Sequence, residues 1–362
     1  MRRSLAGLSL LILGLALAPV AAAQASEYKA PRTSFGAPDL QGRWTNQSIT
    51  NLTRPPGIKL VVTEEEAKAV VNSSFWIKAG EGQEAPVDTN KVPPKGSDAR
   101  FGDQGYNNFW LDPGTSLARV KGELRTSWIT EPASGQVPVS AEARKQIAAY
   151  NQRRAGTSYM DGGNFKNPEE LPISERCLIG FSGTGGPVML NPVYNSNYQF
   201  VQTPDHVMIM AEMVHDARII PIVKDRSEAK HKPNVIRQWL GDSVGWYEGD
   251  TLVVETRNVH PEQAVAGPIY LSDQGKVTER FTRAANDQIF YAFKVEDPVF
   301  YTETWVGEIA LRAKNEPIYE YACHEGNYAE PGILAGSRVF EAKEAAAKAA
   351  KAKPVKAKGK RG

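Results

Sequence analysis

Three clusters of ionisable residues in the second half of the chain have types and spacings suited to acid–base chemistry. The first lies between Glu212 and Arg218, where His215 and Asp216 follow an apolar stretch. A histidine beside a carboxylate is the minimum for general acid–base catalysis, because the carboxylate fixes the imidazole tautomer and supports the imidazolium. The same residues would also form a turn stabilised by an Asp216–Arg218 interaction, with His215 exposed.

The second cluster is Glu279 with Arg280, in a segment that alternates between apolar and polar residues. Glu279 shares its face with Val277 and Phe281, so it lies inside if those two residues form the core. A buried carboxylate needs either a charged partner or a bound proton. If the opposite face is inward, Arg280 lies inside instead. We predict that Glu279 and His215 face one cavity and that at least one of them transfers a proton.

The third cluster is the segment Tyr319–Glu325, in which aromatic and ionisable residues alternate. If this segment is a strand, either His324 or Glu325 lies at the end of the cavity, whichever face is inward. We therefore predict three catalytic residues, Glu279, His215 and Asp216. The predicted binding residues, at the cavity or its rim, are Arg218, Glu212, Trp246, Tyr291, Arg280, His324 and Glu325.

Strands must position these side chains, and the sequence predicts a series of antiparallel hairpins from residue 198 onward. Tight turns are expected at residues 204–205, 248–250 and 286–287, because Gly, Asn and Asp tolerate the backbone conformations that hairpins need. Between the turns, apolar and polar residues alternate with a period of two. The expected strands are 198–202, 206–214, 218–223, 244–247, 251–258, 276–283, 288–296, 301–312 and 318–324, with an earlier strand beginning at Gly42.

This pattern indicates a mainly β protein, an antiparallel up-and-down barrel or a sandwich. Helical segments are not expected between the strands, which argues against a parallel α/β sheet. Ionisable residues inside the strands favour a cavity with a polar lining.

The first half of the chain is rich in Pro, Gly and Asn and is predicted to be an irregular wrap over the barrel, with two short helices. Thr63 and Glu66 form a capping box before residues 67–71, and Ser140 caps a helix over 141–154. Residues 72–113 are expected to form a long surface loop. The expected organisation is a signal peptide at 1–25, the wrap at 26–174, the barrel or sandwich at 175–340 and a basic Ala/Lys tail at 341–362.

The N-terminal residues and the two cysteines indicate the cellular compartment in which the protein resides. Arg2 and Arg3 precede an apolar run and the small-x-small site 23–25, the pattern of a bacterial secretory signal peptide. The run is too short to serve as a membrane span. We therefore expect a periplasmic or secreted protein, in which Cys177 and Cys323 form a disulfide under oxidising conditions.

The charge is divided unevenly along the chain. The total net charge of +2 includes two positive charges in the first three residues and a net six in the tail, which leaves residues 26–340 at about −6. The net negative charge of residues 26–340 argues against nucleic-acid binding. The tail is either solvated or in contact with anionic components of the cell envelope, and either a frayed helix or disordered.

Several motifs resemble those of a known set of proteins. The segments 38–44, 202–205, 241–245, 248–256, 277–281, 295–298 and 319–325 resemble those of a large, mostly uncharacterised family of exported bacterial proteins. The resemblance covers the strand half and implies compartment and architecture more than activity. Separately, Gly42-Arg43-Trp44 before a β meander is similar to the opening motif of lipocalins. Together with the hairpins, it implies a calycin-like barrel.

Three functions are compatible with these observations. The favoured one is an exported enzyme without a cofactor that performs acid–base chemistry, of isomerase, hydratase or lyase type, on a small, largely apolar or aromatic molecule. The glycine-rich run 180–186 lacks the lysine of a phosphate-binding loop, and no metal-ligand spacing is apparent. The alternatives are a periplasmic binder of a hydrophobic molecule that does no chemistry, and a protein that interacts with the cell envelope.

Overall fold

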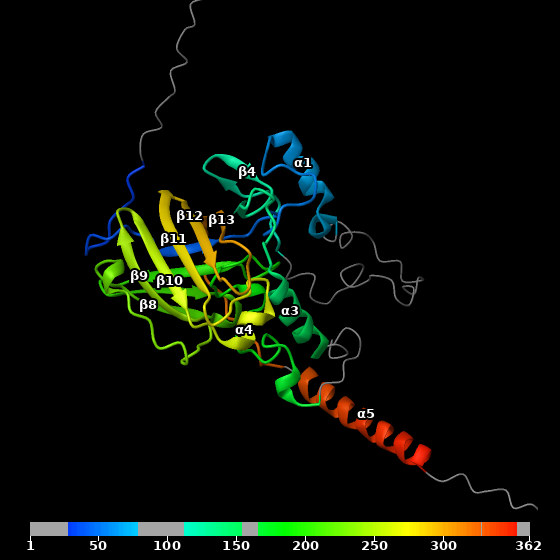
Figure 1. Ribbon diagram of the computed structural model, residues 1–362. Helices are drawn as coiled ribbons and strands as arrows, with labels where there is room; N and C mark the ends of the chain where they lie inside the picture. The colour runs from blue at the N-terminus through cyan, green and yellow to red at the C-terminus, as the bar shows by residue number, and fades with distance from the viewer. Residues whose placement is uncertain (1–27, 79–111, 154–165, 327, 353–362) are drawn as a thin grey trace, which may run out of the picture.

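The protein is built around a nearly closed antiparallel β-barrel of nine strands (Figure 1). The computed structural model describes residues 28–78, 112–153, 166–326 and 328–352. The barrel strands are β1 (Gly42–Thr45), β6 (Asn197–Gln202), β7 (His206–Ala211), β8 (Ala217–Pro221), β9 (Asp242–Glu248), β10 (Thr251–Arg257), β11 (Lys276–Ala285), β12 (Gln288–Glu296) and β13 (Trp305–Ala313). The predicted mainly β, calycin-like barrel is therefore confirmed.

The strands from β6 to β13 follow one another as an up-and-down series, and β1 fills the place between β13 and β6. Because the number of strands is odd, one neighbouring pair must be parallel. That pair is β8 and β9, where the Val223 amide donates to the Gly245 carbonyl at 2.9 Å. The N-terminal segment thus contributes a strand to the barrel itself.

The two ends of the barrel differ in their connections. At one end β6–β7, β9–β10 and β11–β12 are joined by tight turns at 203–205, 249–250 and 286–287. At the other end lie the longer connections 212–216, 258–275 and 297–304, since successive antiparallel strands return to the same side. The connection 258–275 contains α4 (Pro261–Ala266), which lies beside α3 (Ala141–Arg153) in Figure 1.

Aromatic side chains fill much of the barrel interior. Phe281 stacks on Tyr291 with ring centroids 4.9 Å apart and meets Phe200 edge-on at 5.5 Å. At the end with the tight turns, the Arg283 guanidinium lies 4.7 Å from the centroid of the Trp44 ring. This cation–π interaction closes that end of the barrel.

The N-terminal half forms smaller elements around the barrel. β2 (Val61–Val62), β4 (Glu123–Arg125) and β3 (Arg119–Val120) make a three-stranded sheet, and β5 (Ile129–Glu131) pairs with β13. The predicted helix starts are confirmed: Thr63 and Glu66 form the capping box of α1 (Glu64–Ser73), and Ser140 accepts from the third amide of α3. Single 3₁₀ turns are η3 (Pro168–Glu170), η4 (Phe181–Gly183), η5 (Met213–His215) and η6 (Arg226–Glu228).

One predicted strand is wrong, because residues 318–324 have no regular secondary structure. The amide of Tyr319 donates to the Glu212 carboxylate at 3.2 Å, and the amide of Tyr321 donates to the His215 ring at 3.2 Å. The segment is therefore held by side chains and not by a neighbouring strand. The predicted strand 206–214 also ends early, since β7 stops at Ala211 and η5 follows.

The C-terminal segment forms α5 (Ala329–Ala352), so the part of the predicted tail that is described is helical. The predicted signal peptide, most of the predicted loop 72–113 and the last ten residues lie outside the described residues. Within the described ranges, no helix combines the length and apolar character needed to cross a membrane.

The predicted disulfide between Cys177 and Cys323 is confirmed, with α-carbons 6.1 Å apart. It joins the segment before β6 to the segment after β13 across 146 residues of sequence. The bond therefore holds the segment that precedes β6 against the segment that follows β13.

We predict that Cys177→Ser lowers the free energy of unfolding by roughly 4–5 kcal/mol, because the bond closes a long loop in the unfolded chain. Urea denaturation of the variant and the parent measures the difference. Thiol labelling of the denatured, unreduced parent should detect no free cysteine, and two reactive thiols there would contradict the bond.

Candidate functional site

A charged pair lies inside the barrel. Glu279 on β11 has no exposed surface and Arg218 on β8 is 4% exposed. The guanidinium holds both carboxylate oxygens, with Nη1 donating to Oε2 and Nη2 donating to Oε1 at 3.1 Å. The Tyr291 hydroxyl also donates to Oε1, at 2.7 Å. Buried charges persist only when they are paired in this way, so each partner depends on the other.

The environment of this pair keeps the arginine charged. Burial by itself would lower the pKa of Arg218, but the charge and hydrogen bonds of Glu279 outweigh burial and raise it. Burial, together with the charge of Glu279, raises the pKa of Tyr291 well above its ordinary value, so this residue remains a hydrogen-bond donor. The Arg218 Nε atom is buried and has no partner within the described part of the chain.

A glycine-rich segment, residues 180–190, covers the pair at the end of the barrel that carries the long connections. The Met189 amide donates to the Tyr291 hydroxyl at 2.9 Å. The Tyr198 hydroxyl is 3.1 Å from both the Thr184 and the Leu190 carbonyl oxygens, and Asn46 donates to the Met189 carbonyl at 2.9 Å. These hydrogen bonds fix the segment across the barrel mouth.

Asp216 lies beneath the same segment. Its Oδ2 atom accepts from the Gly180 amide at 2.7 Å, and burial raises the pKa of this carboxyl to about 6. A Cβ added at Gly185 would stand 2.9 Å from Oδ2, and one added at Gly186 would stand 3.0 Å from the Arg218 Cζ atom. Adjacent α-carbons are about 3.8 Å apart. Gly185 therefore lies against the Asp216 carboxyl, and Gly186 lies against the Arg218 guanidinium.

The structure does not bring His215 to Glu279. The His215 side chain is exposed, and its Nε2 atom lies 3.2 Å from the Tyr319 carbonyl oxygen. Glu212, which is buried, accepts from the side-chain amides of Asn195 and Asn197, each at 2.9 Å. His215 and Glu212 thus hold the segment around Tyr319, and the expected Asp216–Arg218 turn interaction is replaced by separate partners for each residue.

The remaining predicted binding residues fall in three places. Tyr291 belongs to the buried cluster. Trp246 and Arg280 lie on the outer face of the sheet, where they line one pocket together. His324 and Glu325 are exposed because the strand expected to carry them is absent, so neither is offered to the barrel interior.

Sequence reasoning missed the glycine-rich segment as part of the site. Four glycines lie between residues 180 and 186, followed by Pro187 and a buried run to Leu190. The run lacks the lysine of a phosphate-binding loop, and its residue types alone gave no reason to place it at a site. A cluster of glycines beside buried apolar residues signals close approach of the backbone to something else, here Asp216 and Arg218. Asn46 and Tyr198 gave no sequence signal.

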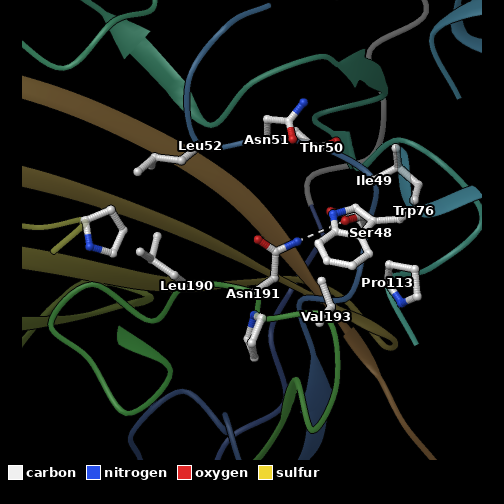
Figure 2. Close-up of a pocket in the computed structure, with 12 residues that line it drawn as sticks. Ser48, Ile49, Thr50, Asn51, Leu52, Trp76, Pro113, Leu190, Asn191 and Val193 are labelled. Atoms are coloured by element: carbon white, nitrogen blue, oxygen red, sulfur yellow. Dashed lines mark hydrogen bonds between the residues drawn. The ribbon is translucent and has the colours of Figure 1, made fainter. Parts of the chain in front are cut away.

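A cleft of about 220 Å³ lies beside the far end of the glycine-rich segment (Figure 2). It is bordered by residues 48–52 on one side and 190–193 on the other, and Asn191 donates to the Ser48 carbonyl across it at 2.9 Å. Leu190 belongs both to the wall of this cleft and to the buried cluster, where its carbonyl accepts from Tyr198.

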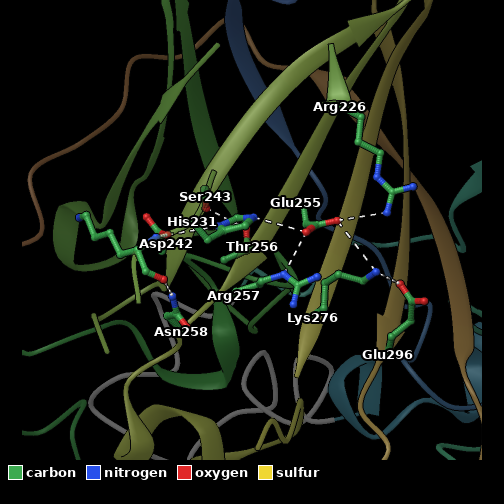
Figure 3. A network of polar contacts seen from close by, with 11 residues as sticks. Arg226, His231, Asp242, Ser243, Glu255, Thr256, Arg257, Asn258, Lys276 and Glu296 are labelled. Carbon is green, nitrogen blue, oxygen red and sulfur yellow. Dashed lines mark hydrogen bonds and ion pairs between the residues drawn. The ribbon is translucent and has the colours of Figure 1, made fainter. Parts of the chain in front are cut away.

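A second polar network lies outside the barrel, around Glu255 on β10 (Figure 3). His231 stands between two carboxylates, with Nδ1 3.2 Å from Asp242 Oδ2 and Nε2 3.4 Å from Glu255 Oε1. Arg257 donates to Glu255 at 3.0 Å. The adjacent His231 ring, against the opposing effect of burial, and the hydrogen bond from Arg257 lower the pKa of Glu255 to about 2. The network pins the connection between β8 and β9 to the sheet.

Within the described residues, no group of three or more His, Cys, Asp or Glu side chains is placed to hold a metal ion. Comparisons with protein-family models, with curated proteins and with solved structures find no match for this chain. The assignment of a function therefore depends on the geometry described above.

We predict that Arg218→Met lowers the free energy of unfolding by about 3–5 kcal/mol, because it leaves the Glu279 carboxylate buried without its partner. Arg280→Met, which removes an exposed cation from the next position of the same strand as Glu279, should cost no more than ~1 kcal/mol. Urea unfolding followed by tryptophan fluorescence measures both. The double variant Arg218→Met/Glu279→Met should recover much of the loss, and equal effects of the two single variants would contradict a buried pair.

A second prediction concerns Glu255. Because its folded-state pKa is lowered to about 2 from an ordinary value of 4.5, its stabilising contribution is present above about pH 4.5 and disappears as the pH falls toward 2. Glu255→Gln should therefore destabilise the protein by roughly 1–3 kcal/mol at neutral pH, and the difference from the parent should shrink between about pH 5 and pH 2. Glu303→Gln, at an exposed position, is the control. A constant difference across this range would contradict the lowered pKa.

Proposed function

We propose that this protein is an exported enzyme that performs acid–base chemistry on a small molecule at the covered end of the barrel, where Asp216 and Arg218 meet the glycine-rich segment. The observation that carries the proposal is the Asp216 carboxyl, whose pKa burial raises to about 6 and which lies under the same glycine-rich segment as the buried Arg218 guanidinium. A group that titrates near neutral pH both accepts and returns a proton efficiently. Perturbed carboxyls of this kind concentrate at active sites.

Arg218 supplies the electrostatic half of the proposed chemistry. Asp216 would take a proton from carbon next to a substrate carbonyl, and the electron pair of the broken C–H bond would move to the carbonyl oxygen. The unpartnered Nε–H of Arg218 would donate to that oxygen as its charge develops. Return of the proton from Asp216 to a different carbon completes an isomerisation, and loss of a leaving group instead completes an elimination.

Glu279 then acts as a positioning residue and not as the proton carrier. Its two oxygens are occupied by Arg218 and Tyr291, and this keeps the guanidinium charged and oriented. The sequence prediction placed proton transfer at Glu279 or His215. Proton transfer is assigned instead to Asp216, the third residue predicted to be catalytic, because burial raises the pKa of this carboxyl and because it lies against Gly185 of the covering segment.

The surroundings favour a substrate that is largely apolar. Met213 and Leu240 lie against the glycine-rich segment, and a Cβ added at Gly185 would stand 2.9 Å from Leu240. Beyond the charged pair, the aromatic rings of Phe281 and Phe200 line the interior. A small carbonyl compound with an apolar body matches this combination of one polar end and a hydrophobic wall.

The disulfide favours a protein that is exported from the cytoplasm. A disulfide in a chain with only two cysteines is stable where conditions are oxidising. The charge pattern of the first 25 residues supports the same conclusion. We accordingly propose a periplasmic or secreted location.

A binder that does no chemistry is the second candidate. The saturation of Glu279 by two donors favours it, since a carboxylate engaged in this way contributes to the structure without exchanging a proton. The two candidates differ in the fate of the ligand. A binder returns it unchanged, whereas an acid–base enzyme exchanges one of its carbon-bound hydrogens with solvent.

The test follows deuterium uptake from D₂O into a panel of small cyclic ketones and enones by NMR. With a responsive compound, Asp216→Asn should reduce exchange by about 10²–10⁴-fold. Because the carboxylate is the active form of the base, the parent rate should rise with pH through about 6, and this inflection should vanish in the variant. The exposed carboxylate variant Asp205→Asn is the control.

Binding of a panel compound without any exchange would favour the second candidate. Exchange that persists in Asp216→Asn would remove this residue from the mechanism. Exchange that is lost equally in Asp205→Asn would show that the effect is not specific to the proposed site.

A further inference from the structure

A second pocket, of about 340 Å³, lies on the outer face of the barrel over strands β9 to β13. Strand pairing explains its lining, since directly opposed residues of antiparallel strands share a face. Trp246 faces Val253, Val253 faces Arg280, and Arg280 faces Ala292, so one row crosses four strands. Adjacent strands are about 4.8 Å apart, which makes this row roughly 14 Å long.

The base of the pocket is apolar. Trp246 is 3% exposed and Val253 is 1% exposed, although both belong to the outer face. Val306 on β13 and Ala292 on β12 extend this base, with Thr278 on β11 as its one hydroxyl side chain. The protein covers Trp246 and Val253 almost completely, so the apolar surface left for a ligand is that of Ala292 and Val306, which are only partly buried.

The rim of the pocket is cationic. Arg226 of η6, Lys276, Arg280 and Lys294 all line it, against two lining carboxylates, Glu248 and Glu255. Glu255 is already shared with His231 and Arg257, which lie outside the pocket. Glu296, also outside the pocket, pairs with Lys276 at 2.9 Å and with Lys294 at 3.1 Å, so the positive charge left for a ligand is that of Arg226 and Arg280.

Two of these cations retain donors for a ligand. Arg226 approaches Glu255 only to 3.8 Å, beyond hydrogen-bond distance, and its side chain is 69% exposed. Arg280 uses Nη2 for Glu248 at 2.8 Å, and its side chain is 44% exposed. Both guanidiniums border the same pocket, and a guanidinium fork matches a carboxylate in shape and charge.

We infer that this outer pocket binds a small amphipathic carboxylate, with its charged group at Arg226 and Arg280 and its apolar body on Ala292 and Val306. The apolar base argues for a hydrocarbon body and against a sugar, whose hydroxyls would lack partners there. The site is separate from the proposed reaction centre, because it lies on the opposite face of β11. Arg280 and Glu279 are neighbours in sequence and point to opposite sides of the sheet.

The test is isothermal titration of the full chain with octanoate at low ionic strength, with 1-octanol and acetate as probes that carry only the apolar body or only the charge. Octanoate should bind, and both partial probes should bind more weakly by at least about ten-fold, because each retains half of the contacts. Arg226→Gln and Arg280→Gln should each weaken octanoate binding about ten-fold. Raising the salt concentration should weaken it further.

Lys224→Gln, on the same connection as Arg226 but outside the pocket, is the matched control and should bind like the parent. Asp216→Asn should also bind octanoate like the parent, which separates this site from the proposed reaction centre. The inference is overturned if octanoate does not bind, if octanol binds equally well, or if neither arginine variant changes the affinity while both keep the melting temperature of the parent.

Discussion

The ion pair between Arg218 and Glu279 is the interaction on which the rest of the barrel interior depends. Two buried opposite charges are tolerated only if each satisfies the other, and here Tyr291 takes part as well. The pair joins β8 to β11, which are not neighbours in the sheet. The glycine-rich segment then closes over it, since Gly186 has a φ of +86° and no side chain to collide with the guanidinium.

The two ends of the barrel differ, and the proposed reaction centre lies at only one of them. Tight turns and the Arg283–Trp44 contact close one end, and they leave little chain that could move. Long connections, the disulfide and residues 180–190 gather at the other end, where the titrating carboxyl Asp216 also lies. Functional residues commonly lie on connections that a rigid sheet positions, and this barrel follows that division.

The pleat of β11 gives the protein two unlike surfaces from one strand. Glu279 points inward to the aromatic interior, and Arg280 points outward to the cationic pocket. Each is matched by charge on its own side, Glu279 by Arg218 and Arg280 by Glu248. A shift of one residue in strand register would bury Arg280 and expose Glu279, so both ion pairs also hold the register.

The sequence by itself determined the barrel strands, their turns, two helix starts and the disulfide, because alternation, turn residues and caps are local signals. It also placed an ionisable group inside β11, but it did not choose between Glu279 and Arg280. That choice, the partner Arg218, the cover formed by residues 180–190 and the separation of His215 from Glu279 were decided only by the tertiary structure. Each depends on which distant segments meet, and a buried charge selects its partner through space rather than along the chain. The strand expected at 318–324 is absent for the same reason, since the side chains of Glu212 and His215, and not a neighbouring strand, accept from the backbone amides of Tyr319 and Tyr321.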